Sequence, residues 1–231
     1  MTLEENMGKD WYQMLSPFIK TDTFQKIATF TQEGYNKKKV YPERDNVFKA
    51  FRLTPFKDVR VIWLGMEPYN SINNAVGVSF AINPAKHYIP PSLQMILTEL
   101  ESSYDKGLIL DFDYTFESWA KQGVLMLNTA LTVEKKKAGS HIELWKPFTK
   151  EVFNLLNTYH TGLIFVLLGN EAKKYKSMIG VNHHIVEAPH PASECYSRGS
   201  GFLGSKIFNK VDDILIGING SDNLIKWNEY R

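Results

Sequence analysis

Four short apolar runs divide the chain into a pattern typical of strands that alternate with helices. Helix-length segments separate these runs, which lie at about residues 59–64, 124–127, 163–168 and 183–187. Short β-branched and aliphatic runs in this arrangement predict parallel strands. We therefore expect an α/β fold, a three-layer α/β/α domain with a central four-stranded, mainly parallel sheet. No change in composition marks a boundary, so we expect residues 1–231 to form a single domain.

The segments between the runs carry the apolar spacing of amphipathic helices. An apolar stripe predicts one helix over residues 8–35, and its members are Trp11, Leu15, Phe18 and Ile19. Another helix is expected to open at Pro90-Pro91-Ser92, where a first turn tolerates proline and favours a hydroxyl. The remaining predicted elements are helices around 47–51, 148–160, 170–179 and 204–217 and a short extended segment at 77–82.

Polar residues follow directly after three of the four predicted strands. Glu67 and Tyr69 come after the first strand, Asn128 after the second and His190 after the fourth. Ligands of open α/β sheets bind in the crevice outside the carboxyl ends of the strands. These four side chains, far apart in the sequence, are therefore expected to line one pocket.

Charge and cysteine content narrow the class of protein only a little. The chain has 27 lysines and arginines against 25 acidic residues, a net charge of +2, which neither implies nor excludes a nucleic-acid partner. Cys195 is the single cysteine, so an internal disulfide is impossible. Since the first eleven residues lack the apolar core of a signal peptide, and no apolar stretch approaches the roughly 18 residues that cross a bilayer, we expect a cytoplasmic protein without membrane contact.

Several polar motifs match one enzyme family in order and spacing. They are Gly65-Met66-Glu67-Pro68-Tyr69-Asn70, Gly77-Val78-Ser79-Phe80, Pro90-Pro91-Ser92-Leu93, the strand end Gly123 to Val133, and His190-Pro191. On these motifs the chain resembles the family 1 uracil-DNA glycosylases from about Val40 to Trp227. The resemblance implies that fold and an enzyme that hydrolyses the N-glycosidic bond of deoxyuridine in DNA, as the first step of base-excision repair. Such enzymes flip the nucleotide out of the stack into a snug pocket.

The resemblance also implies which residues carry the reaction. Glu67 would stabilise the positive charge on the sugar and orient water, and His190 would donate a hydrogen bond to the departing uracil. The substrate-binding residues would be Met66, Tyr69, Phe80 and Asn128, with Asn128 reading the uracil edge and Tyr69 excluding the methyl group of thymine. No metal and no organic cofactor are implied.

DNA is the partner that the resemblance implies, single-stranded or double-stranded and containing uracil. The residues expected to hold its phosphates, which position a strand without reading its sequence, are Pro90, Pro91, Ser92, Ser193 and Arg198. A DNA-mimicking inhibitor protein is a further possible partner, and the enzyme is expected to act as a monomer.

Departures from the family pattern fall within the active region. Glu67 replaces an aspartate, and its extra methylene would move the carboxylate by roughly an ångström, a misplacement that can cost about a hundredfold in rate. Met66 replaces a glutamine that serves the pocket largely through its main chain. Asn70 replaces a histidine close to the attacking water and is expected to modulate the reaction.

The loop after His190 also departs from the family, which carries a leucine wedge there. Glu194 is expected to point its charge toward DNA, which disfavours insertion into a duplex and affects single strands, which need no wedge, less. The alternative is that Tyr196 or Phe202 takes the place of the wedge.

These departures leave two other functions open. One is a DNA-binding or replication-scaffold protein with the glycosylase fold and little or no catalysis. The other is a glycosylase for a modified pyrimidine, against which Tyr69 and Asn128 argue, because the thymine barrier and the uracil reader both remain.

Overall fold

A four-stranded parallel sheet forms the centre of the computed structural model, which describes residues 1–71, 75–86, 88–104, 112–197 and 199–228. Its strands stand in the order β3-β2-β5-β6, with bounds β2 (Val61–Gly65), β3 (Val124–Asn128), β5 (Ile164–Leu168) and β6 (His184–Ala188). Every neighbouring pair is parallel. The predicted fold class is thereby confirmed, and each strand lies within one or two residues of its apolar run.

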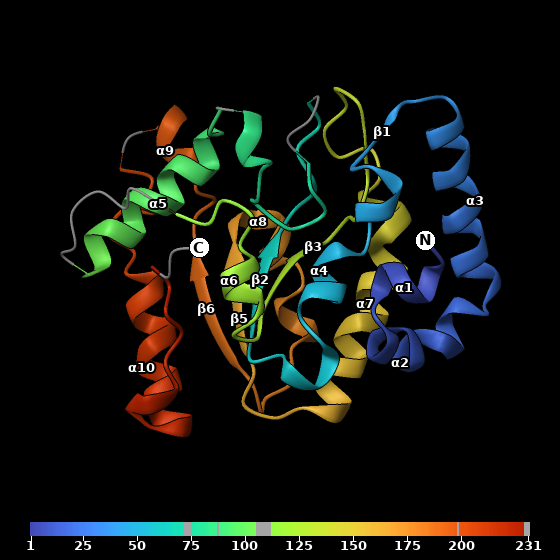
Figure 1. The fold of residues 1–231 in the computed structure, drawn as a ribbon. Coiled ribbons are helices and arrows are strands. Elements are labelled where there is room, and N and C mark those ends of the chain that lie inside the picture. The colour runs from blue at the N-terminus through green and yellow to red at the C-terminus, as the bar shows by residue number, and fades with distance from the viewer. Residues whose placement is uncertain (72–74, 87, 105–111, 198, 229–231) are drawn as a thin grey trace.

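The apolar runs are continuous because helices cover both faces of the sheet (Figure 1). Every residue of β2, β3 and β5 is buried, whereas the edge strand β6 begins with an exposed residue and then alternates between partly buried and buried positions. Strand residues alternate between the two cores, as the pleat requires: Ile62 and Leu64 belong to one core, Val61 and Trp63 to the other.

Each face of the sheet has its own set of helices (Figure 1). On the side with the N-terminus lie α1 (Leu3–Met7), α2 (Lys9–Ile19), α3 (Asp22–Asn36), α4 (Lys49–Leu53), α7 (Ile142–Tyr159) and α8 (Gly169–Lys173). On the other side lie α5 (Pro91–Tyr104), α6 (Glu117–Ala120), α9 (Ser193–Tyr196) and α10 (Ile207–Asn219). The 3₁₀ turns are η1 (Arg44–Asn46), η2 (Phe56–Asp58), η3 (Pro84–Lys86), η4 (Lys176–Met178) and η5 (Ser221–Asn223).

A short ribbon beside the carboxyl ends of the strands was not predicted. In this ribbon β1 (Val40–Tyr41) pairs antiparallel with β4 (Val133–Glu134). Residues 135–141 lead from β4 to the first turn of α7. The ribbon thus fixes the start of a loop that crosses the top of the molecule.

Three predicted elements were wrong in extent. The single helix over 8–35 is two helices, α2 and α3, because Thr21 accepts a hydrogen bond from the N–H of Phe24 at 3.3 Å and caps a new start. The helix predicted from 148 begins at Ile142, so that Pro147 lies inside it. The helix predicted over 170–179 ends at Lys173 and continues as a 3₁₀ turn.

The predicted extended segment 77–82 is also wrong. Phe80 has a φ of 60°, in the left-handed region, so the chain turns there instead of extending. The backbone N–H of Ser79 bonds to the carbonyl of Met126 at 3.0 Å, which holds the turn against β3.

Among the helices in the described part of the chain, none combines the length and the apolar character that crossing a bilayer requires.

Candidate active site

A cavity of about 210 Å³ opens at the carboxyl ends of β2 and β3. Gly65 at the end of β2 is paired with Asn128 at the end of β3, so residues after both strands reach the same space. The lining residues are Met66, Glu67, Pro68, Tyr69, Asn70, Phe80, Ser92, Asn128 and His190. The four side chains that the sequence predicted to converge do line one cavity.

Hydrogen bonds from the chain after β3 hold the backbone after β2 in place. The carbonyl of Met66 accepts from the N–H of Ala130 at 3.0 Å and from the hydroxyl of Thr129 at 2.7 Å. The N–H of Thr129 bonds to the carbonyl of Gly65 at 3.0 Å. Met66 therefore uses its main chain to fix the segment that carries Glu67.

The carboxylate of Glu67 meets a backbone amide from a distant loop. Its two oxygens lie 3.0 and 2.9 Å from the N–H of Gly139. Burial raises the pKa of the half-buried Glu67, and the bond from Gly139 works in the opposite direction. A half-buried carboxylate with one backbone donor retains acceptor capacity for a water molecule or a substrate.

Tyr69 and Phe80 form the aromatic wall of the cavity. The Tyr69 hydroxyl donates to the carbonyl of Phe80 at 3.2 Å, which ties the two segments together. Burial raises the pKa of Tyr69, so the phenol stays protonated. The Phe80 ring lies 6.1 Å from the His190 ring, centroid to centroid.

Asn128 brings a buried amide to the cavity. Its side chain is 7% exposed, and no hydrogen bond joins its amide to a described residue. Since Asn128 lines the cavity, its amide donors and acceptor are available to a ligand bound there. Gly65 leaves room for the Asn128 amide and the Phe80 ring, because a methyl group there would lie 2.6 Å from Asn128 Oδ1 and 3.2 Å from the Phe80 ring.

His190 is held as a neutral imidazole of one tautomer. Its Nδ1 accepts the backbone N–H of Ala192 at 3.2 Å, which leaves the ring proton on Nε2. Burial lowers the pKa of His190 and so favours the neutral ring. The backbone at Gly169 packs against it, since a Cβ there would lie 2.8 Å from His190 Cβ.

Asn70 and Ser92 complete the rim. The carbonyl of Asn70 accepts from the N–H of Lys136 at 2.9 Å, and its side chain lines the cavity. Ser92, in the first turn of α5, is buried and also lines the cavity. Pro90 and Pro91 lie beside it in sequence but are not among the lining residues.

The glycine-rich loop after His190 differs from the prediction in the direction of its charge. Glu194 does not point outward: its carboxylate accepts from the N–H groups of Gly199, Phe202 and Leu203 at 3.1, 2.8 and 3.1 Å. Burial opposes ionisation of Glu194, but its hydrogen bonds with Ser200 and these N–H groups outweigh burial and lower the pKa to about 2. The prediction of a charge aimed at DNA is wrong, because the loop amides need an acceptor.

A second carboxylate organises the end of the same loop. Glu99 of α5 is fully buried and accepts from the N–H groups of Gly204 and Lys206, both at 2.6 Å. Together Glu194 and Glu99 accept from five backbone amides between residues 199 and 206. We call this pair of side chains the loop acceptors.

The two aromatic residues expected as candidates for a wedge differ in their exposure. Phe202 is fully buried, so its prediction as a wedge is wrong. Tyr196, the last residue of α9, is 87% exposed. The hydroxyl of Ser193 is engaged inside the loop, donating to the carbonyl of His190 at 2.6 Å and lying 2.7 Å from the Ser200 hydroxyl. Arg198 lies outside the described residues.

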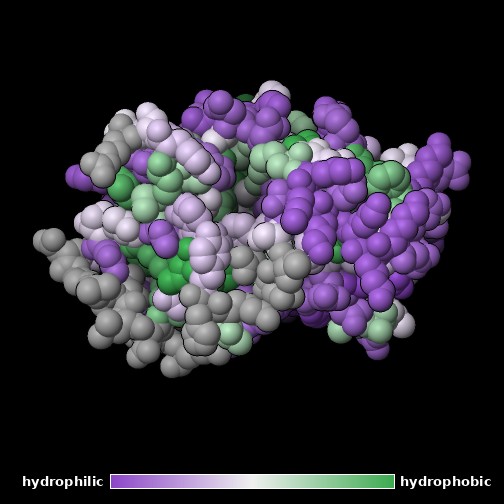
Figure 2. Space-filling view, turned by 90° about the horizontal axis from the view of Figure 1, so that it is seen from above, coloured by the Kyte–Doolittle hydropathy of each residue, from purple (hydrophilic) through white to green (hydrophobic). Residues whose placement is uncertain are grey.

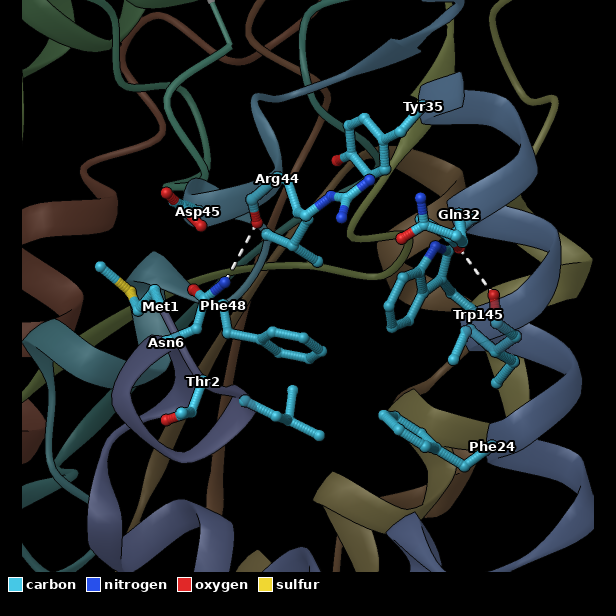
Figure 3. Close-up of a pocket in the computed structure, with 15 residues that line it drawn as sticks. Met1, Thr2, Asn6, Phe24, Gln32, Tyr35, Arg44, Asp45, Phe48 and Trp145 are labelled. Atoms are coloured by element: carbon cyan, nitrogen blue, oxygen red, sulfur yellow. Dashed lines mark hydrogen bonds between the residues drawn. The ribbon is translucent and has the colours of Figure 1, made fainter. Parts of the chain in front are cut away.

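A second cavity of about 240 Å³ lies between α1, α3 and η1, away from these residues (Figure 3). Its wall is largely apolar and includes Phe24, Phe48 and Trp145. Polar groups at its edge are hydrogen-bonded to each other: the Asn6 side chain donates to the carbonyl of Arg44 at 3.0 Å. This cavity has no pair of groups suited to acid–base chemistry, and we regard it as a gap between helices.

Among the described residues, no group of three or more His, Cys, Asp or Glu side chains is arranged to hold a metal ion.

The sequence did not identify Gly139 as a contributor to the site. A glycine after a run of lysines reads as an ordinary loop position, and no signal in the chain links it to Glu67.

Comparisons with known proteins cover the whole cavity. The sequence model of the family described as "Uracil DNA glycosylase superfamily" matches residues 51–211. A uracil-DNA glycosylase of Alkaliphilus oremlandii is 38% identical over 220 residues, 94% of this chain and 95% of that protein. One of Streptococcus mutans is 40% identical over 208 residues, 89% of this chain and 93% of that protein. The crystal structure of mimivirus uracil-DNA glycosylase shares the fold, with a TM-score of 0.86 at 23% identity over 98% of this chain and 89% of that one.

Proposed function

This chain belongs to the uracil-DNA glycosylase superfamily, and we propose that it hydrolyses the bond between uracil and deoxyribose in DNA, leaving an abasic site. The observation that carries the proposal is the Asn128 amide, which lines the cavity without a hydrogen-bond partner among the described residues, together with the Glu67 carboxylate and the His190 imidazole. These three groups supply a base reader, an anion for the sugar and a donor for the leaving base.

Uracil fits the reader better than the other pyrimidines do. The amide of Asn128 offers one acceptor and two donors, which match the N3–H and O4 of uracil. Cytosine presents the reverse pattern and would leave the buried amide unpaired. Phe80 stacks on the base, and Tyr69 stands where the methyl group of thymine would lie.

The bond breaks as positive charge develops on the sugar and negative charge on uracil. Glu67 stabilises the sugar cation, orients the water whose oxygen bonds to C1′ and accepts the proton that this water loses, while the electron pair of the broken bond stays on uracil. The neutral His190 donates from Nε2 to a uracil oxygen as charge develops there. No step of this chemistry requires a metal or an organic cofactor.

DNA must present the base outside the stack, because the reacting atoms are unreachable inside a duplex. Met66 shapes the pocket through its main chain, and Asn70 modulates the water site. The groups proposed to hold phosphates are Pro90, Pro91, Ser92, Ser193 and Arg198. We further propose that the chain acts in the cytoplasm as one domain and a monomer, and that a DNA-mimicking inhibitor protein would compete for the same surface.

Excision from a single-stranded oligonucleotide with one uracil tests the proposal. Strand cleavage after alkali should require uracil, with no cleavage of thymine or cytosine oligonucleotides. Asn128→Leu should lower excision by a factor of about 10³ or more, since the base reader is lost. Asn219→Leu, at the exposed end of α10, is the matched control and should keep full activity.

DNA binding, measured on the same variants, separates an enzyme from a scaffold. Intact DNA affinity without uracil excision by the wild-type protein would overturn the proposal in favour of the scaffold function. Excision of a modified pyrimidine but not of uracil would redirect it to another substrate.

A further inference from the structure

The contact between Glu67 and Gly139 joins the reacting carboxylate to the loop between β4 and α7. Both carboxylate oxygens lie within 3.0 Å of the same backbone nitrogen, so one amide contacts both of them. A hydrogen bond to a charged acceptor is stronger than one between neutral groups and favours a defined position. The position of the Glu67 carboxylate therefore depends on this loop.

Bonds along the loop leave that amide little freedom to move. The N–H of Lys135 bonds to the carbonyl of Lys39 at 2.8 Å, and the N–H of Lys136 bonds to Asn70, itself three residues after Glu67. The Ser140 hydroxyl accepts the N–H of Glu134 at 2.8 Å, which closes the loop on itself.

The far end of the loop is anchored through a buried hydroxyl. Thr132 Oγ1 lies 2.8 Å from Nδ1 of His141 and accepts from the Trp145 indole N–H at 2.7 Å. All three side chains are buried. Hydrogen bonds thus fix the loop on both sides of Gly139.

Gly139 adopts a backbone conformation that most residues avoid. Its φ is 77°, in the left-handed region. Space does not explain the glycine, because a Cβ there would meet nothing closer than Ile142 Cδ1 at 3.8 Å. The requirement at this position is therefore conformational, and the conformation is the one that presents the N–H to Glu67.

We propose that Gly139 is a positioning residue whose N–H fixes the Glu67 carboxylate in its reactive place, and that the length of glutamate is matched to this amide. The inference rests on the proposed function and concerns the same site. An aspartate would end roughly an ångström short of the amide, and a misplacement of that size costs about a hundredfold in rate. The loop thereby compensates for the longer side chain that replaces the family's aspartate.

Glu67→Asp tests the match of lengths without touching the loop. We expect kcat to fall by about a hundredfold while KM changes less than threefold, although aspartate is the residue of the family pattern. A Glu67→Asp variant with wild-type or higher kcat would overturn the inference. Wild-type protein without uracil excision would instead contradict the proposed function, so the two failures are distinguishable.

Gly139 itself is tested by two substitutions that fill the same open space. Valine is strongly disfavoured at positive φ, whereas asparagine tolerates it, so Gly139→Val should move the N–H and Gly139→Asn should hold it. We expect kcat of Gly139→Val at least tenfold below that of Gly139→Asn, with similar KM. Thermal unfolding of both variants checks that the fold is retained.

The pH profile supplies a readout that a purely structural defect would not move. Loss of the Gly139 bond removes a group that lowers the Glu67 pKa, so the acid limb of kcat should move to higher pH in Gly139→Val. In the double variant with Glu67→Asp, the valine should add little further loss. Additive losses, or an acid limb that does not move, would overturn the inference.

Discussion

The backbone N–H of Ala192 lies 3.2 Å from Nδ1 of His190, so a residue two positions along the chain selects the tautomer of the proposed hydrogen-bond donor. The bond is local, and it keeps the proton on Nε2 whenever the ring is neutral. Burial adds to this by lowering the His190 pKa. His190 is therefore ready to donate without first losing a proton near neutral pH.

His190 and Glu67 together predict the pH dependence of the reaction. Burial lowers the pKa of His190 below its ordinary 6.5 and raises that of Glu67 above its ordinary 4.5. The active form has a neutral His190 and an ionised Glu67, so the single-turnover rate should fall on acidification, with the His190 limb below pH 6.5 and the Glu67 limb above pH 4.5. His190→Ala should lower the rate by about 10²–10³, as for loss of one donor to a developing anion. A rate that already declines as pH falls from 8 to 7 would contradict the neutral His190.

Gly65→Ala should displace the amide proposed to read the base. The added methyl group would lie 2.6 Å from Asn128 Oδ1, so the Asn128 side chain would have to shift. We expect kcat/KM for uracil excision to fall by at least about a hundredfold. Gly217→Ala is the control, because a Cβ at Gly217, inside α10, meets nothing within 4 Å and alanine favours helix. Equal activity of the two variants would show that the base binds elsewhere.

Tyr196→Ala should distinguish duplex from single-stranded substrates. Tyr196 is 87% exposed at the end of α9, in the loop that follows His190, where an inserted ring could hold open the space left by a flipped base. We expect at least a tenfold loss of excision from duplex DNA and less than a threefold loss from single strands. Tyr159→Ala, an exposed tyrosine at the end of α7, should alter neither. Equal losses on both substrates would rule out a wedge function.

Lys136→Gln should weaken DNA binding through phosphate contacts. Its backbone is bonded to Asn70 at the rim of the cavity and its side chain is exposed. Hydrophilic side chains gather on the right of the face seen from above (Figure 2). Removal of one phosphate contact should reduce the slope of log affinity against log salt by about 1. Lys57→Gln, in η2 before the opposite end of β2, should leave the slope unchanged. An unchanged slope for Lys136→Gln would place the strand elsewhere.

Sequence reasoning succeeded where strand ends determine position. Asn128 and His190 follow buried strands, and the carboxyl ends of parallel strands meet at one edge, so their meeting in a cavity was predictable. The family resemblance is confirmed by the family model, which matches residues 51–211.

The sequence did not predict the contacts in which a carboxylate accepts a hydrogen bond from a backbone amide. Glu194 looks like a surface charge in a polar loop, but the amides of residues 199–203 turn it inward. Gly139 carries no side chain, and its bond to Glu67 depends on the β1–β4 ribbon, two two-residue strands too short to predict. Thr21 is a recognisable cap, yet the apolar stripe continues across it and conceals the break between α2 and α3.

The loop acceptors, Glu194 and Glu99, have a consequence for the thermodynamics of binding. By accepting from five backbone amides between residues 199 and 206, they order a glycine-rich segment during folding, before any DNA is present. The conformational entropy of that segment is then lost in folding and not at the encounter with a strand. Association with DNA should consequently carry a small ordering entropy from this loop, although its sequence contains three glycines.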